Sequence, residues 1–138
     1  MRYYSIMLKK ISLSAMVFTY LFAGIFHFTK WQYFLSLSPS FLPKSFAYVL
    51  VGITGLFEIL FSLFLAFPTT RRGACYGIIL LWSMSLPIDL YILFIGGAGI
   101  ALPFWELEGM IPFHLLLIGW AWWHVRLEKK GFRSQIQI

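Results

Sequence analysis

The chain has 138 residues, of which 60% are hydrophobic, 20% aromatic and only 12% charged. A water-soluble domain of this length cannot bury so much apolar surface, so the composition excludes an ordinary soluble enzyme and indicates one membrane domain over residues 1–138. The formal net charge of +6 comes from basic residues beside apolar stretches, which is typical of membrane orientation, so no nucleic-acid partner is expected.

Four apolar stretches are long enough to cross a bilayer, which takes roughly 20 helical residues. They predict an all-α, integral membrane four-helix bundle with spans at about residues 11–28, 46–67, 74–95 and 111–125. Pro68 is expected to end the second span, and Gly96 and Gly97 the third. The fourth span is the shortest, so its tryptophans, Trp120, Trp122 and Trp123, are expected near the interface as anchors.

The basic residues predict the orientation of these spans. With four crossings, two Lys or Arg residues lie on one side of the membrane, Lys30 and Lys44. The other nine lie on the opposite side: Arg2, Lys9, Lys10, Arg71, Arg72, Arg126, Lys129, Lys130 and Arg133. Because cytoplasmic segments carry the excess of basic residues, both termini are predicted to be cytoplasmic in a multi-pass protein of the bilayer.

The two outer loops are unusually apolar for exposed connections. The first, "WQYFLSLSPSFLPKS", is too short for a span, and Pro39 and Pro43 prevent a continuous helix. The second, "GGAGIALPFWELEGM", is similar but contains Glu106 and Glu108. Both are predicted to lie in the membrane interface and to cap the bundle from outside.

Four ionisable residues fall within or at the ends of the predicted spans, each in a different helix: His27, Glu58, Asp89 and His114. Such residues are costly in a bilayer and are functional candidates by default. The predicted orientation puts all four between the membrane centre and the outer face. If they face inward, they line one pocket that opens to the outside.

Helical spacing supports this inward facing. In the second span, one helix face carries three small residues beside the carboxylate: Gly52, Gly55, Glu58 and Ser62. Small residues allow helices to approach closely, so Glu58 is predicted to point into the bundle. Tyr20, Gly24 and His27 share a face of the first span in the same way.

The third span combines a carboxylate with a proline. Pro87 cannot donate a backbone hydrogen bond to the Ser83 carbonyl and tends to kink a helix. Ser85 lies one turn before Asp89, on the same face. Ser85 and Pro87 are therefore predicted to support the pocket, together with Tyr20 and Gly24.

Structural alternatives remain open for these residues. His27 and His114 could be ordinary polar ends of helices at the interface. Glu58 could be a neutral carboxyl group that hydrogen-bonds across helices. His124, beside Arg126, is given no role. The spacings HxxxH, ExxH and CxxC are absent from the sequence, so no metal site is expected.

Taken together, "AGIFHFTK", "SPSFLP", "GLFEIL", "TTRRGA", "LPIDLYI" and "IPFHLLLIGWAWW" resemble, in order and spacing, the DoxX-like family of small four-span bacterial membrane proteins. The resemblance extends from about Ala23 to Trp123. The residues that match the family pattern are Gly24, His27, Phe28, Pro39, Pro43, Glu58, Arg71 and Arg72. The resemblance implies a four-helix bundle in the bacterial inner membrane.

The chain departs from the family pattern at the predicted pocket. The usual asparagine of the third span is replaced by Asp89, after Pro87 and Ile88. Met110 and His114 stand where the family usually has arginine and glutamine. Relatives in the family have been linked to thiosulfate:quinone oxidoreductase and to membrane complexes that handle oxidative stress.

Three functions are compatible with these observations. The first is an accessory subunit of a quinone-linked redox system, with no intrinsic cofactor, quinone as the candidate ligand and a redox protein as partner. The second is a binding protein or acid–base enzyme for an apolar small molecule or lipid. The third is a structural or assembly protein without a ligand site. A homo-oligomer is a candidate assembly, because a glycine-lined helix face favours helix association.

Overall fold

A computed structural model describes residues 2–94 and 104–136, with side chains over 6–94 and 108–127. Within these ranges all regular structure is α-helical. The helices are α1 (Arg2–Thr29), α2 (Trp31–Ser36), α3 (Lys44–Ala66), α4 (Arg71–Phe94) and α5 (Phe104–Ile136).

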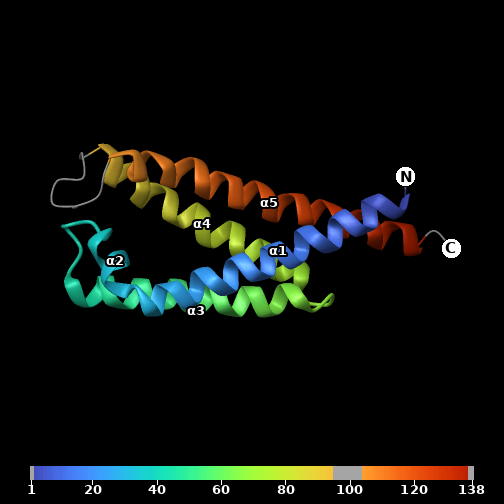
Figure 1. Ribbon diagram of the computed structural model, residues 1–138, viewed down its shortest axis with the longest axis horizontal. Coiled ribbons are helices and arrows are strands. Elements are labelled where there is room, and N and C mark those ends of the chain that lie inside the picture. Colours follow the sequence, from blue (N-terminus) through green and yellow to red (C-terminus); the bar gives the residue numbers. More distant parts are fainter. Residues whose placement is uncertain (1, 95–103, 137–138) are drawn as a thin grey trace.

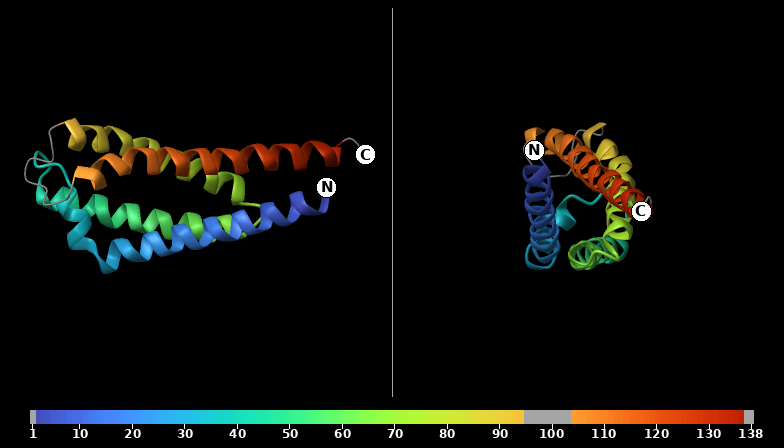
Figure 2. Two further views of the ribbon diagram at one scale, coloured as in Figure 1. Left: turned by 45° about the horizontal axis from the view of Figure 1, so that its top comes forward. Right: turned by 90° about the vertical axis from the view of Figure 1, so that its right-hand side faces the viewer.

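The four long helices form two pairs, α1 with α3 and α4 with α5 (Figure 1). The pairs approach each other at the end of the bundle that carries both termini and diverge toward α2, as Figure 2 shows from a second direction. The chain passes from one pair to the other through the turn between α3 and α4. The all-α prediction is confirmed, and both termini lie at the same end.

Three of the helices are long and apolar enough to cross a membrane: Ile6–Thr29, Lys44–Ala66 and Arg71–Phe94. They leave large apolar side chains exposed, among them Phe18, Phe22, Leu80 and Met84. Exposed apolar side chains are favourable against the lipid of a bilayer and unfavourable in water. The chain is therefore a membrane protein. α5 is not among the three, and its membrane crossing stays a prediction.

Two helices extend well beyond the predicted spans. α1 begins at Arg2 rather than near residue 11, and α5 covers Phe104–Ile136 rather than residues 111–125. Lys, Arg and Glu are good helix formers, so a helix continues past its apolar part into polar surroundings. Glu106 and Glu108 consequently lie in α5 and not in a loop. Residues 95–103, with the expected stop at Gly96 and Gly97, lie outside the described residues.

Glycine allows α1 and α3 to pack closely. A Cβ on Gly24 would lie 2.7 Å from the Gly55 carbonyl oxygen, and a Cβ on Gly55 would lie 2.7 Å from Cβ of His27. The predicted inward face of α3 is confirmed for Gly55, Glu58 and Ser62. It is wrong for Gly52, where an added Cβ would meet nothing within 4 Å. Val51, one turn before Gly55, is buried there instead.

The end of the bundle at which the two pairs meet, called the closed end below, has an apolar core. Its buried side chains come from α1, α3, α4 and α5: Met16, Leu65, Ala74, Cys75, Ile78, Ala121 and Val125. A polar contact joins α1 to α5 beside this core. The Trp120 indole nitrogen donates to the Ser12 hydroxyl over 2.8 Å, and Ser12 Oγ lies 3.1 Å from Nε2 of His124.

His124, which was given no functional role, has a structural one, since this buried imidazole helps to connect α1 with α5. Its partner Ser12 is distant in sequence, and no local pattern indicates the pairing. Trp120 is partly buried against the core, while Trp122 and Trp123 are exposed. Only the latter two have the exposure that an interfacial anchor needs.

Candidate functional site

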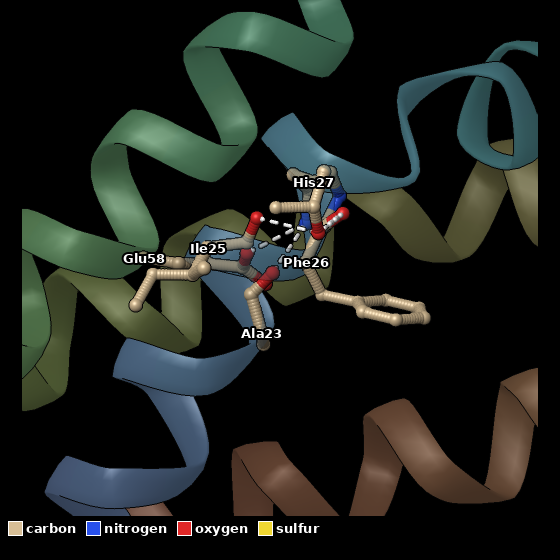
Figure 3. A network of polar contacts seen from close by, with 6 residues as sticks. Ala23, Ile25, Phe26, His27 and Glu58 are labelled. Carbon is tan, nitrogen blue, oxygen red and sulfur yellow. Dashed lines mark hydrogen bonds and ion pairs between the residues drawn. The ribbon is translucent and has the colours of Figure 1, made fainter.

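The first polar pair joins the two helices of one half of the bundle. His27 of α1 places Nδ1 2.8 Å from Oε2 of Glu58, on α3 (Figure 3). The geometry of that approach is not a hydrogen bond: Nδ1 instead makes one with the Ala23 carbonyl oxygen, 3.1 Å away. Glu58 is fully buried. The small residues Gly24 and Gly55 make this arrangement, because they bring the backbones of α1 and α3 together.

The second polar pair joins the two helices of the other half. Nδ1 of His114, on α5, donates to Oδ2 of Asp89, on α4, over 2.5 Å. Both residues are buried. α4 continues through Pro87, and the Ser85 hydroxyl donates to the Leu81 carbonyl over 3.2 Å. The carboxylate fixes the ring orientation of His114. Each half of the bundle thus contains one histidine beside one carboxyl group.

An aromatic ring stacks on each histidine. The ring of Phe34, from α2, lies 3.7 Å from that of His27 between centroids, at 14°. The ring of Trp82, from α4, lies 4.3 Å from that of His114, at 28°. Phe34 of α2 therefore covers the first pair on one side, and Pro43 precedes α3 as its N-cap.

A cavity of about 840 Å³ lies between the two helix pairs, on the α2 side of the closed end. It brings together all four candidate residues, His27, Glu58, Asp89 and His114. Tyr20 and Ser85 also line it, whereas Gly24 and Pro87 do not. Gly24 supports the first pair through the close approach of α1 to α3. Apolar and aromatic side chains make up most of its wall, among them Phe26, Phe34, Trp82, Ile88, Phe113 and Leu117.

Exposed side chains of α1 and α5 line one side of the cavity, which is called the lateral opening below. Phe18 and Phe22 of α1 line it and are each 70% exposed, and Phe113 of α5 lines it and is 52% exposed. In a bilayer these side chains would face lipid. An opening toward the outside stays a prediction. At the end of the cavity near α2, residues of α2 and the following turn, including Tyr33 and Leu42, line the wall.

Several buried polar atoms at the cavity have no hydrogen-bond partner among the described residues. They are the Tyr20 hydroxyl, both carboxyl oxygens of Glu58 and the Trp82 indole nitrogen. Trp82 was not predicted as a site residue. A signal was present, because Trp82, Ser85 and Asp89 share one helix face. Trp82 is apolar in most of its surface, and ordinary core packing explains such a residue equally well.

The two polar pairs do not form a metal centre. Within the described residues, no three His, Cys, Asp or Glu side chains lie close enough together to hold a metal ion. Each histidine has one carboxylate beside it, and the pairs belong to different halves of the bundle. The chemistry available in the cavity is hydrogen bonding and proton exchange by imidazole and carboxyl groups.

The fold and the cavity define a class: a helical membrane protein with a polar cavity inside an apolar wall. The model of a protein family, described as a domain of unknown function (DUF8561), matches residues 16–125, and the chain belongs to this family. The match includes all four candidate residues. No curated protein and no solved structure matches the chain.

Proposed function

We propose that the protein binds a lipid-soluble small molecule in the cavity between its helix pairs, with the polar part of the molecule at the four ionisable residues. The observation that carries this proposal is a cavity of about 840 Å³ with an apolar wall and two histidine–carboxylate pairs. Ligand pockets typically combine apolar walls with a few convergent polar groups in this way.

The lateral opening supports a ligand that arrives from the membrane. Phe18, Phe22 and Phe113 offer an apolar path between α1 and α5. A hydrophilic ligand would gain little from such a path, whereas a molecule already dissolved in lipid needs no transfer through water. An apolar molecule with one polar end fits both the path and the polar groups inside.

The proposal includes α5 as a fourth crossing, both termini in the cytoplasm and the cavity in the outer half of the bilayer. The shared end of the two termini supports an even number of crossings. At that end Arg72 lies over the Tyr76 ring and Arg126 over the Trp122 ring, at 5.8 and 5.6 Å. Basic and aromatic side chains of this kind anchor helices at an interface. The proposed location, the bacterial inner membrane, is based on the DoxX-like resemblance.

The second candidate function is an accessory role in a quinone-linked redox system. The DoxX-like resemblance suggests it, and the two histidine–carboxylate pairs suit a ligand whose head group gains and loses protons. A redox protein would then be the partner. Deletion of the gene should lower a quinone-linked activity of the membrane, and unchanged activity with every such substrate tried would exclude this role.

Native mass spectrometry of the protein, gently extracted from its own membrane, tests the binding proposal. The expected result is a complex heavier than the bare chain by one small molecule, and fragmentation would identify it. Loss of that molecule in an Asp89→Leu variant that keeps its helical circular dichroism would place it in the cavity. A bare chain or a bare homo-oligomer, from every mild detergent tried, would favour a structural role.

A further inference from the structure

Three buried polar side chains meet where the cavity reaches the core of the closed end. Tyr20 comes from α1, Glu58 from α3 and Trp82 from α4, and all three line the cavity. Tyr20 is 1% exposed and Glu58 is 0% exposed. The Tyr20 hydroxyl, both Glu58 carboxyl oxygens and the Trp82 indole nitrogen lack a hydrogen-bond partner among the described residues.

These groups are neighbours of one another. The Trp82 indole lies within side-chain hydrogen-bond range of the Tyr20 hydroxyl, and the Glu58 carboxyl group interacts with that hydroxyl electrostatically, although no pair among the three has full hydrogen-bond geometry. His27 lies against one oxygen of Glu58, with Nδ1 2.8 Å from Oε2, but this contact lacks hydrogen-bond geometry because Nδ1 is directed to the Ala23 carbonyl oxygen. The inner end of the cavity therefore contains four polar atoms that need partners.

The chemistry of these atoms restricts what can satisfy them. Buried polar groups in proteins are nearly always hydrogen-bonded, so a partner is expected here. The indole N–H of Trp82 only donates, the hydroxyl of Tyr20 donates and accepts, and the carboxyl group of Glu58 has at least one oxygen that only accepts. A partner must thus accept from Trp82 or Tyr20 and also donate to Glu58. A hydroxyl group does both with one oxygen atom.

We infer that the cavity recognises a hydroxyl group at Tyr20, Glu58 and Trp82, so that its ligand is an apolar alcohol, phenol or hydroquinone. This inference rests on the proposed binding function and adds the chemistry of the head group. The hydroxyl lies at the inner end of the cavity, where Glu58 belongs to the first polar pair and Trp82 stacks on His114 of the second. The apolar part extends from there toward the lateral opening. An ether or a carbonyl group accepts but does not donate, so it leaves a Glu58 oxygen unpaired.

A competition experiment tests this recognition. The purified full-length protein is incubated with equal amounts of hexadecyl alcohol and hexadecyl methyl ether, and native mass spectrometry reads the ratio of the two bound species. The alcohol is expected to exceed the ether by roughly tenfold, the value of one hydrogen bond in a buried site. In the Tyr20→Phe variant, the ratio of bound alcohol to bound ether should come close to the ratio in which the two compounds are present in the detergent.

Tyr33→Phe is the matched control, because Tyr33 also lines the cavity but lies on α2. It should keep the preference for the alcohol. Trp82→Phe is a second variant, which removes a donor and keeps an aromatic ring, and it should also lower the preference. A comparison between variants cancels any difference in how the two compounds partition into detergent.

The outcomes separate this inference from the proposed function. Binding of both compounds without preference would overturn the hydroxyl site, with water as the partner of the three groups, and would leave the binding function standing. An alcohol preference that survives both Tyr20→Phe and Trp82→Phe would overturn it as well. Absence of binding by either compound, with no native ligand, would contradict the binding function itself.

Discussion

Nδ1 of His114 donates to Oδ2 of Asp89 over 2.5 Å, and this bond connects α5 to α4 inside an otherwise apolar wall. An ionised carboxylate accepts from an imidazole N–H more strongly than an amide oxygen does. Asp89 of α4 and His114 of α5 thus form one pair across the two helices.

Asp89→Asn should weaken this pair without breaking it. The amide oxygen still accepts from His114, so we expect the free energy of unfolding to fall by about 1 kcal/mol. Asp89→Leu leaves the imidazole without its partner and should cost about 3 kcal/mol. Reversible unfolding in mixed detergent micelles, followed by circular dichroism, measures both. Equal costs for the two variants would show that the hydrogen bond contributes nothing.

Gly55→Ala should force α1 and α3 apart. The new Cβ would meet Cβ of His27 at 2.7 Å and the Gly24 carbonyl oxygen at 3.2 Å, and backbone cannot move aside as a flexible side chain can. We expect a loss of about 2 kcal/mol in the free energy of unfolding.

Gly52→Ala is the control on the same helix. Its Cβ would enter open space, so the higher helix propensity of alanine should leave stability unchanged or raise it by up to about 1 kcal/mol. Thermal denaturation of the two variants in parallel measures whether Gly55→Ala lowers the stability while Gly52→Ala leaves it unchanged or raises it. Similar destabilisation by both substitutions would contradict the close α1–α3 contact.

Ser12→Ala should loosen the closed end. It removes the acceptor of the Trp120 indole N–H and the neighbour of His124, so a loss of about 1–2 kcal/mol is expected. Thr29→Ala is a suitable control, because the exposed Thr29 hydroxyl donates within its own helix, to the Ile25 carbonyl. Its effect should stay within about 0.5 kcal/mol. Protection of α1 amides from hydrogen exchange should fall in the first variant alone.

Cysteine labelling tests the membrane topology. In a Cys75→Ser background, Ser40→Cys should react with a membrane-impermeant maleimide on intact cells, whereas Thr69→Cys and Ser134→Cys should react only after lysis. Ser40 lies in the turn before α3 and Thr69 in the turn before α4, and both are exposed. Reaction of Ser134→Cys from outside, together with Ser40→Cys, would show that α5 does not cross.

Sequence periodicity predicted which side chains of α3 face inward, because a helical repeat converts spacing directly into direction. Glu58 is the clearest case: small residues one turn away made its facing predictable. The prediction for Gly52 is wrong by one position, because Val51 is buried in its place. A spacing of three or four residues fits either of two helix faces that differ by a small rotation. The packed partner α1 decides between the two, and only the three-dimensional structure contains that information.

The pairing of His27 with Glu58 and of His114 with Asp89 could not be predicted in the same way. Each pair joins different helices, and sequence alone does not tell which helix lies beside which. His124 illustrates the same limit, because its partner Ser12 is 112 residues away. Trp82 was missed for another reason: its indole nitrogen matters only because no described residue accepts from it.

The closed end has a mechanical consequence for the cavity. The two helix pairs are held together on one side of the cavity, by the turn between α3 and α4 and by the contact of Ser12 with Trp120 and His124. A helix of roughly 20 residues is about 30 Å long, so a rotation of about 5° at this pivot displaces the far end by about 2–3 Å. We therefore expect the ends of α1 and α5 far from the pivot to separate more easily than the ends at the pivot, where the core stays packed.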